Sequence, residues 1–323
     1  MSIFKLPDMK SLLRFLLIVL GIVLALFALD RAFGAVMDHA VSRARGGDTR
    51  NHYYISNCLD DSVVVMGSSR ANHHYVPQIL ADSLEMTVYN AGTDANGIML
   101  ASMQLNNMLA RGHRPALIVY DYFPKFDLAD ISDLNRAIQR MRPFAGISGM
   151  DSIISDIDKY ENIKLKSYLY RYNSTFIQVL SDFVNPRQVV LSGYKPLYGS
   201  ITTRFPRPAD VVGTDRVDSV KVRYLRRFAD ICRREGISLV FVISPYYFDG
   251  MDFRMAELRG IVGPDVPVID LSDSPAFVGQ DSLFADPSHL NDRGASLFTS
   301  RLLDSLTTRG IVPERLARES KSR

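Results

Sequence analysis

The sequence is poor in cysteine, with Cys58 and Cys232 as the only two among 323 residues. Neither has histidine, cysteine or acidic companions at the spacing of a zinc site, so we expect no metal and no other cofactor. The two thiols could pair in an oxidising compartment, but the distance between them in space cannot be read from the sequence. We therefore expect two unpaired and mostly buried cysteines.

The sequence also lacks an excess of one charge. It has 38 Lys and Arg residues against 35 Asp and Glu residues, which leaves a net charge of +3. We find no concentrated basic face in the sequence, and such a face is the electrostatic mark of proteins that bind nucleic acid. Nucleic acid is therefore not an expected partner.

Charged residues are absent from residues 15–29, and Leu12 and Leu13 extend this apolar run past Arg14. As a helix, residues 12–29 would be about 27 Å long, which is enough for the hydrocarbon core of a bilayer. No polar face interrupts the run, which disfavours a buried core helix. We expect residues 1–30 to be a cytoplasmic tail and a single anchor in the inner (cytoplasmic) membrane, with the remaining chain extracytoplasmic, that is, periplasmic. A cleaved signal peptide, with small residues at Ala32 and Gly34, is the alternative.

The chain after the apolar run divides into four stretches. Residues 31–57 are polar and contain Gly46 and Gly47, so we expect an irregular linker. A catalytic-type domain over 58–310 is expected to carry an insertion at about 127–215 that covers the active-site edge, and residues 311–323 are a charged tail. Aromatic residues within the insertion could stack on sugar rings, although their spacing is more typical of a core: Tyr168, Tyr170, Tyr172 and Phe176.

Five short apolar runs predict the fold. They show no alternation of polar and apolar residues, which is typical of strands buried on both faces of a parallel sheet. The runs are residues 63–66, 86–89, 116–120, 238–243 and 266–270. Helical patterns lie between them, so the sequence predicts an α/β fold: a five-stranded parallel sheet between two layers of helices, with right-handed crossovers.

Residues 61–75 contain a candidate nucleophile. An apolar strand runs into Gly67, Ser68 and Ser69, and a helix beginning at Pro77 follows. Ligands bind at the carboxyl edge of parallel sheets, so a serine just past the strand is well placed to react. The alternative is an ordinary turn in which the serine hydroxyls bond the local backbone.

A second pattern near the end of the chain favours the reactive serine. Asp286 and His289 lie three residues apart in a loop that leads into a helix. The Asp286 carboxylate can orient the imidazole, whose other ring nitrogen can take the proton of a serine hydroxyl. Serine needs such a base because its own pKa is far above neutral.

Together these blocks resemble the SGNH or GDSL hydrolases, whose fold is a flavodoxin-like three-layer sandwich. Gly67-Ser68-Ser69 is similar to the first block of that family, with Ser69 at the nucleophile position, and Asp286 and His289 are similar to the last. Asn90-Ala91-Gly92 is similar to the second block, so the resemblance implies an oxyanion hole made by the backbone amides of Ser69 and Gly92. The third block, Gly-x-Asn-Asp, is absent, and Asn96 is the candidate for its donor.

Other polar residues lie close to these blocks. Asp121 lies at the same sheet edge as Ser69 and is expected either to contact substrate or to hold a loop amide. Arg70 could bind an anionic polymer or form a surface ion pair. His73 and His74 are adjacent and have no acidic or cysteine partner nearby, so we expect a structural or substrate-edge role and not a metal site.

Within the family, the Gly-Ser-Ser block and the anchor are more similar to the proteins of D-alanyl transfer and alginate acetylation than to secreted lipases. This resemblance implies an esterase or O-acyltransferase that acts on O-acyl groups of a cell-envelope glycan or polymer through an acyl-serine. A membrane-bound O-acyltransferase is a candidate partner. Two alternatives stay open: a catalytically silent scaffold or glycan-binding protein, and a soluble secreted esterase.

Overall fold

The computed structural model describes residues 8–129, 134–145, 150–185, 191–209 and 216–312. Its centre is a five-stranded sheet in the order β2-β1-β3-β4-β5, and every neighbouring pair is parallel. The strands are β1 (Val63–Gly67), β2 (Val88–Asn90), β3 (Leu117–Asp121), β4 (Ser238–Ile243) and β5 (Val268–Asp270). This order is flavodoxin-like, and the prediction of a five-stranded parallel sheet is confirmed.

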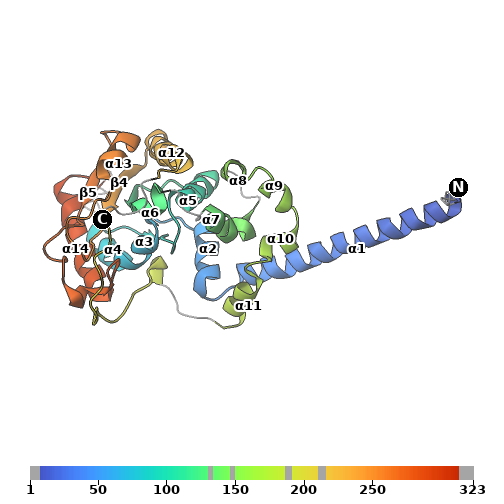
Figure 1. Cartoon of the computed structure of the whole chain (residues 1–323), viewed down its shortest axis with the longest axis horizontal. Coiled ribbons are helices and arrows are strands. Elements are labelled where there is room, and N and C mark those ends of the chain that lie inside the picture. The colour runs from blue at the N-terminus through green and yellow to red at the C-terminus, as the bar shows by residue number, and fades with distance from the viewer. Residues whose placement is uncertain (1–7, 130–133, 146–149, 186–190, 210–215, 313–323) are drawn as a thin grey trace.

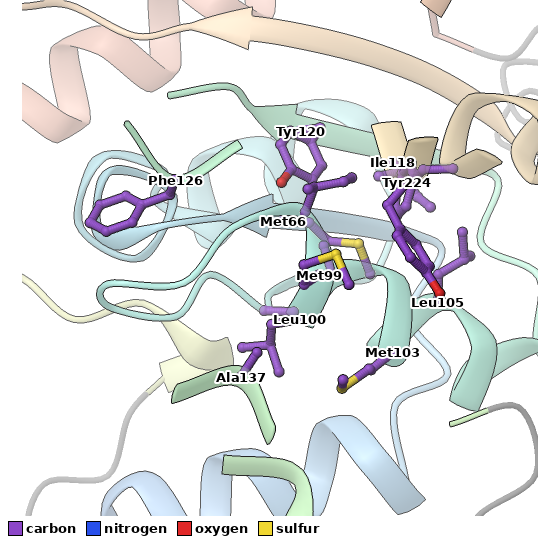
Figure 2. Packing of buried hydrophobic residues seen from close by; sticks show 14 of the residues in the cluster. Met66, Met99, Leu100, Met103, Leu105, Ile118, Tyr120, Phe126, Ala137 and Tyr224 are labelled. Carbon is purple, nitrogen blue, oxygen red and sulfur yellow. The ribbon is translucent and has the colours of Figure 1, made fainter. Parts of the chain in front are cut away.

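Helices cover both faces of the sheet, because successive side chains of each strand point to opposite sides. Val64 and Met66 of β1 belong to the core shared with α5 (Ile98–Ala110) and α12 (Ser219–Glu235). Val63 and Val65 belong to the core shared with α4 (Pro77–Leu84) and α14 (Asp292–Thr308). Figure 2 shows the first core, in which the side chains of α5 pack beside Met66, Ile118 and Tyr120 of the sheet. The three-layer arrangement predicted from the sequence is therefore present.

The remaining elements lie around this sandwich. The short helices are α3 (Ser69–His74), α6 (Pro124–Asp127), α13 (Met255–Val262) and the 3-10 turns η1 (Arg142–Phe144), η2 (Leu191–Gly193) and η3 (Asp281–Leu283). A two-stranded antiparallel ribbon, β6 (Phe284–Asp286) and β7 (His289–Leu290), precedes α14. Helix α1 (Met9–Ser42) leaves the body on one side, and six further helices lie towards that side (Figure 1). They are α2 (Gly47–Asn57), α7 (Leu134–Met141), α8 (Asp151–Ile157), α9 (Glu161–Lys164), α10 (Tyr168–Tyr172) and α11 (Phe176–Val184).

Helix α1 is long, and its N-terminal part extends away from the body without packing against it (Figure 1). Its apolar stretch is exposed along its whole length and is long enough to cross a membrane. These features fit both of the predicted alternatives, a permanent anchor and a signal sequence.

The irregular linker predicted over residues 31–57 is not what the structure shows. Helix α1 continues to Ser42 and α2 begins at Gly47, so only residues 43–46 are irregular. Gly34, Met37 and Val41 form a buried stripe on α1 that packs against α10 and α11. This stripe holds the segment helical, although its packing partners lie more than a hundred residues later in the chain.

The insertion predicted at about 127–215 does not lie over the active-site edge as a whole. Helices α7 and α8 pack on α5, while α10 and α11 pack on α1. Its later part does reach the edge, since Lys195 donates its backbone N–H to Asn72 of α3 and Leu197 accepts from Asp292. The predicted charged tail lies outside the described residues from 313 onward.

Two smaller expectations are corrected. Both cysteines are free, but Cys58 is exposed and only Cys232 is buried. No concentrated basic face is visible along the sequence, yet α12 presents one beside an open depression of about 550 Å³. It is lined by Arg223, Arg226, Arg227, Arg233, Arg234 and Asp230. The basic residues of α12 are spaced so that they meet only when the chain is helical.

Candidate active site

The candidate nucleophile lies where β1 turns into α3. Gly67, the last residue of β1, has φ +138°, and a Cβ at this position would lie 2.6 Å from the carbonyl oxygen of Asp121. Only glycine tolerates both the backbone conformation and the contact. The turn places Ser69 at the first residue of α3, at the carboxyl edge of the sheet.

The structure brings Ser69, His289 and Asp286 together, although 220 residues separate the first two. Ser69 Oγ lies 2.8 Å from His289 Nε2, and His289 Nδ1 lies 2.8 Å from Asp286 Oδ2. The β6–β7 ribbon pairs Asp286 with His289 across the turn. The side chains of His289 and Asp286 are 24% and 45% exposed, so a substrate can reach the group.

Hydrogen bonds around Asp286 fix its charge and the tautomer of His289. Burial works against ionisation of the carboxyl, but hydrogen bonds from His289 Nδ1 and from the backbone amides of Ser288 and His289 outweigh it and lower the pKa of Asp286. An ionised carboxylate only accepts, so the ring proton lies on Nδ1. Nε2 is left free to accept from the Ser69 hydroxyl, which is the arrangement that activates a serine.

Arg70 and Asp121, the two candidate substrate-binding residues, are instead fully buried, which also rules out the surface ion pair considered for Arg70. Their side chains are 0% exposed, and Arg70 Nε lies 3.6 Å from Asp121 Oδ1. The Arg70 guanidinium also donates to Ser244 Oγ and to the carbonyl of Pro245, and lies over the Phe123 ring. These contacts join α3 to the ends of β3 and β4 beneath the site, and the buried pair has no surface to offer a substrate.

The predicted oxyanion donors are only partly free. The Gly92 amide, expected in the oxyanion hole, donates instead to Asn90 Oδ1 at 3.0 Å. Asn96 is buried and donates its side-chain amide to the carbonyl of Asp94 at 2.9 Å. The Ser69 amide lies in the first turn of α3, where a helix provides no acceptor of its own. Of the two predicted backbone donors, the Ser69 amide remains available to an oxyanion, while the Asn96 side-chain amide has one of its two N–H groups bonded to Asp94.

Gly92 has a different role, which is steric. A Cβ at residue 92 would lie 2.4 Å from the Asn72 backbone nitrogen and 2.7 Å from Ala71 Cβ. Glycine is needed because the loop after β2 packs directly on α3, the helix that carries Ser69.

The two adjacent histidines have different surroundings. His73 lies 2.6 Å through Nδ1 from the carbonyl oxygen of Lys195 and 3.2 Å through Nε2 from Asp94 Oδ1. Its ring stands perpendicular to that of His289, with centroids 5.7 Å apart. His74 is fully buried and lies 2.9 Å through Nδ1 from Ser244 Oγ. The expected structural or substrate-edge roles fit these contacts.

Sequence reasoning missed Asp94, Lys195 and the side chain of Ser244 as part of the site. Asp94 also accepts from Asn72 Nδ2 at 2.7 Å, and despite burial these contacts with His73 and Asn72 lower its pKa. The sequence carried a signal for two of the three: Asp94 lies two residues after the second block, and Ser244 directly follows a strand at the active edge. Lys195 lies in the insertion and gave no signal.

The residues that the structure describes contain no candidate metal-binding site. Within those ranges, no group of three or more His, Cys, Asp or Glu side chains is arranged to hold a metal ion.

Comparisons with known proteins find similarity at the level of structure. No protein-family profile and no curated protein sequence matches the chain. It is similar to a solved structure from Desulfitobacterium hafniense DCB-2, assigned to the G-D-S-L family of lipolytic proteins, with TM-score 0.32 and 11% identity over 74% of this chain and 96% of that one. It is also similar to a structure from Streptococcus pneumoniae described as a platelet activating factor, with TM-score 0.37 and 10% identity over 88% of this chain and 99% of that one. At these scores the likeness carries no argument about activity, which is argued below from the site alone.

Proposed function

We propose that this protein is a membrane-anchored, extracytoplasmic serine esterase or O-acyltransferase that acts on O-acyl groups of a cell-envelope glycan or polymer. The observation that carries the proposal is the hydrogen-bonded line from Ser69 Oγ through His289 to Asp286, with distances of 2.8 Å on both sides of the ring. The anchor and the choice of polymer are supported by α1 and by the resemblance of the sequence blocks.

The first half of the reaction forms an acyl-serine. Ser69 Oγ attacks the ester carbonyl while His289 Nε2 takes the hydroxyl proton, and the Asp286 carboxylate stabilises the imidazolium that results. The tetrahedral intermediate collapses as His289 returns the proton to the leaving alcohol. The backbone N–H of Ser69 would donate to the oxyanion, a contribution of about 3 kcal/mol for a single donor in enzymes where it is measured.

The second half decides between an esterase and a transferase. His289 Nε2 takes a proton from the acceptor as the acceptor attacks the acyl-serine carbonyl, and then gives that proton to Ser69 Oγ as the ester bond to the serine breaks. If the acceptor is water, the product is a free acid, and if it is a sugar hydroxyl, the acyl group is transferred. A membrane-bound O-acyltransferase is a candidate partner that would supply or accept the acyl group.

A catalytically silent scaffold is the second candidate. It is favoured by one observation, the internal use of the Gly92 amide and of one N–H of the Asn96 side-chain amide. A site with fewer oxyanion donors would hold an acyl ester without turning it over quickly. A soluble secreted esterase is the third candidate and requires cleavage of α1.

The test is covalent labelling of the full-length protein in detergent micelles with a fluorophosphonate probe, followed by peptide mass spectrometry. We expect the label on Ser69, and its loss in Ser69→Ala and His289→Ala. Ser68→Ala is the matched control, because Ser68 is the neighbouring serine and its buried hydroxyl has no hydrogen-bond partner among the described residues. Absence of label in folded wild-type protein would reject the enzyme in favour of the scaffold, and membrane fractionation separates the anchored from the secreted form.

A further inference from the structure

Helix α1 is fastened to the body at the point where its apolar run ends. Asp30, the first charged residue after the run, accepts hydrogen bonds from Ser167 Oγ at 2.7 Å and from the backbone amides of Tyr168 and Leu169 at 3.1 and 2.8 Å. The Asp30 side chain is only 10% exposed. Through these bonds, one carboxylate joins α1 to the first turn of α10.

Packing around this contact leaves little freedom for α1 to swing. A Cβ at Gly34 would lie 2.3 Å from the Tyr168 ring, so the ring rests directly on the α1 backbone. Arg31 covers the same ring, 4.6 Å from its centroid. One turn further along, Tyr172 donates its hydroxyl to Asp38 at 2.6 Å. The direction of α1 relative to the body is therefore set by direct contacts.

These contacts place α10 at the level where the apolar run stops. Leu29, the last residue of the run, is 65% exposed, and the next residue bonds the amide of Leu169. If residues 12–29 span a bilayer, the membrane surface crosses α1 at the height of Leu169. Figure 1 shows α9 and α10 on the side of the body from which α1 leaves.

Three large apolar side chains are exposed at this level. Tyr160, Ile163 and Leu169 are 57%, 65% and 54% exposed, although the body offers a core in which apolar groups would be more stable. Exposed lysines lie beside and between them in the sequence, and together they form what we name the α9–α10 patch: Tyr160, Ile163, Leu169, Lys159, Lys164 and Lys166. Apolar side chains with an aromatic ring and flanking lysines are typical of segments that lie in the membrane interface.

We propose that the α9–α10 patch rests on the bilayer that α1 crosses, with its apolar side chains at the boundary between headgroups and acyl chains. The occupant is lipid because the patch is continuous, through Asp30 and Leu169, with the exposed apolar surface of α1. Lys159 and Lys166 would extend their charged ends to the headgroups, whereas the Lys164 ammonium is paired with Asp158 at 2.7 Å and with Glu161 at 3.3 Å. The body then meets the membrane at two places, which fixes the orientation of the Ser69 site above the surface. This inference rests on the anchor in the proposed function and not on its chemistry.

The absence of tryptophan makes a direct test possible, because a single introduced tryptophan is the only one in the protein. Full-length Ile163→Trp and Leu169→Trp variants are placed in phosphatidylcholine and phosphatidylglycerol nanodiscs with and without brominated lipid, which quenches indole on contact. Leu26→Trp in α1 is the positive control. Leu297→Trp, at an exposed position of α14, is the matched negative control.

We expect brominated lipid to cause a loss of tryptophan emission at positions 26, 163 and 169 and none at 297. Unquenched emission at 163 and 169 beside quenched emission at 26 would overturn the proposal and assign the patch to a protein partner or a second copy. Unquenched emission at all four positions would overturn it together with the anchor. Fluorophosphonate labelling of Ser69 in the same samples tests the proposed serine chemistry independently of the membrane contact. Failure of the membrane contact and failure of the proposed function can therefore be told apart.

Discussion

His74 Nε2 accepts the backbone N–H of Leu290 at 3.0 Å, and so joins the helix that begins with Ser69 to the strand that contains His289. The accepting nitrogen carries no proton, so Nδ1 does, and it donates to Ser244 Oγ. Burial, reinforced by the positive charge of Arg70, lowers the pKa of His74 well below its ordinary value. A neutral histidine thus fixes the distance between nucleophile and base.

We predict that His74→Phe slows fluorophosphonate labelling of Ser69 by about 100-fold, since a shift of about 1 Å between reacting groups has that effect. Phenylalanine fills the same space but leaves the Leu290 amide without an acceptor. His74→Gln, which keeps an acceptor, should recover part of the rate. His113→Gln, a histidine bonded to the Asp61 carbonyl away from the site, is the control and should label like wild type. Wild-type labelling rates in folded His74→Phe would contradict this role.

The buried pair of Arg70 and Asp121 leads to a stability prediction. Removing one partner of a buried ion pair leaves an uncompensated charge, so Arg70→Met should lower the free energy of unfolding by about 3–5 kcal/mol. The double variant Arg70→Met with Asp121→Asn removes both charges and should regain most of that loss. The measurement is urea denaturation of the three proteins in the same detergent. Equal losses in the single and double variants would show that the pair is not coupled.

The same pair shows where sequence reasoning stops. The strands were predictable because Val63, Val119 and Val240 lie in uninterrupted apolar runs. Ligands bind at the carboxyl edge of parallel sheets, and this rule then placed Ser69 and His289 at one site. An arginine beside a serine, however, looks like any surface residue until the fold places Asp121 next to it. The helical course of residues 31–42 likewise depends on Tyr168 packing on Gly34. Such contacts join positions that the sequence alone does not pair.

The close packing of Gly92 gives a prediction with a matched control. Gly92→Ala should destabilise the protein by about 1–3 kcal/mol, because its Cβ would overlap the α3 backbone and force a shift. Gly260→Ala makes the same chemical change within α13, where a Cβ meets nothing within 4 Å. It should stabilise the protein by about 0.5–1 kcal/mol through better helix propensity. Thermal unfolding of both variants measures the difference, and a neutral Gly92→Ala would refute the steric role.

His52 gives the protein a predicted loss of stability in acid. Burial, followed by the positive charge of Arg140, lowers the pKa of His52 to about 4, from about 6.5 in the unfolded chain. Above about pH 6.5 neither state binds the proton and the full stability is present. As the pH falls towards about 4, the unfolded state binds the proton and the folded state does not, so folding is disfavoured. Between about pH 7.5 and about pH 5 this amounts to a loss of about 2 kcal/mol from His52.

His52→Gln isolates this contribution, because glutamine keeps a neutral side chain that can accept from Arg140 but does not titrate in this range. Denaturant midpoints measured at both pH values should therefore fall less for His52→Gln than for the wild type. Other titrating groups, His74 among them, are present in both proteins, so they contribute equally to both slopes and cancel in the comparison. An equally steep fall in the variant would mean that His52 is protonated in the folded protein, and the proposed cause would be wrong.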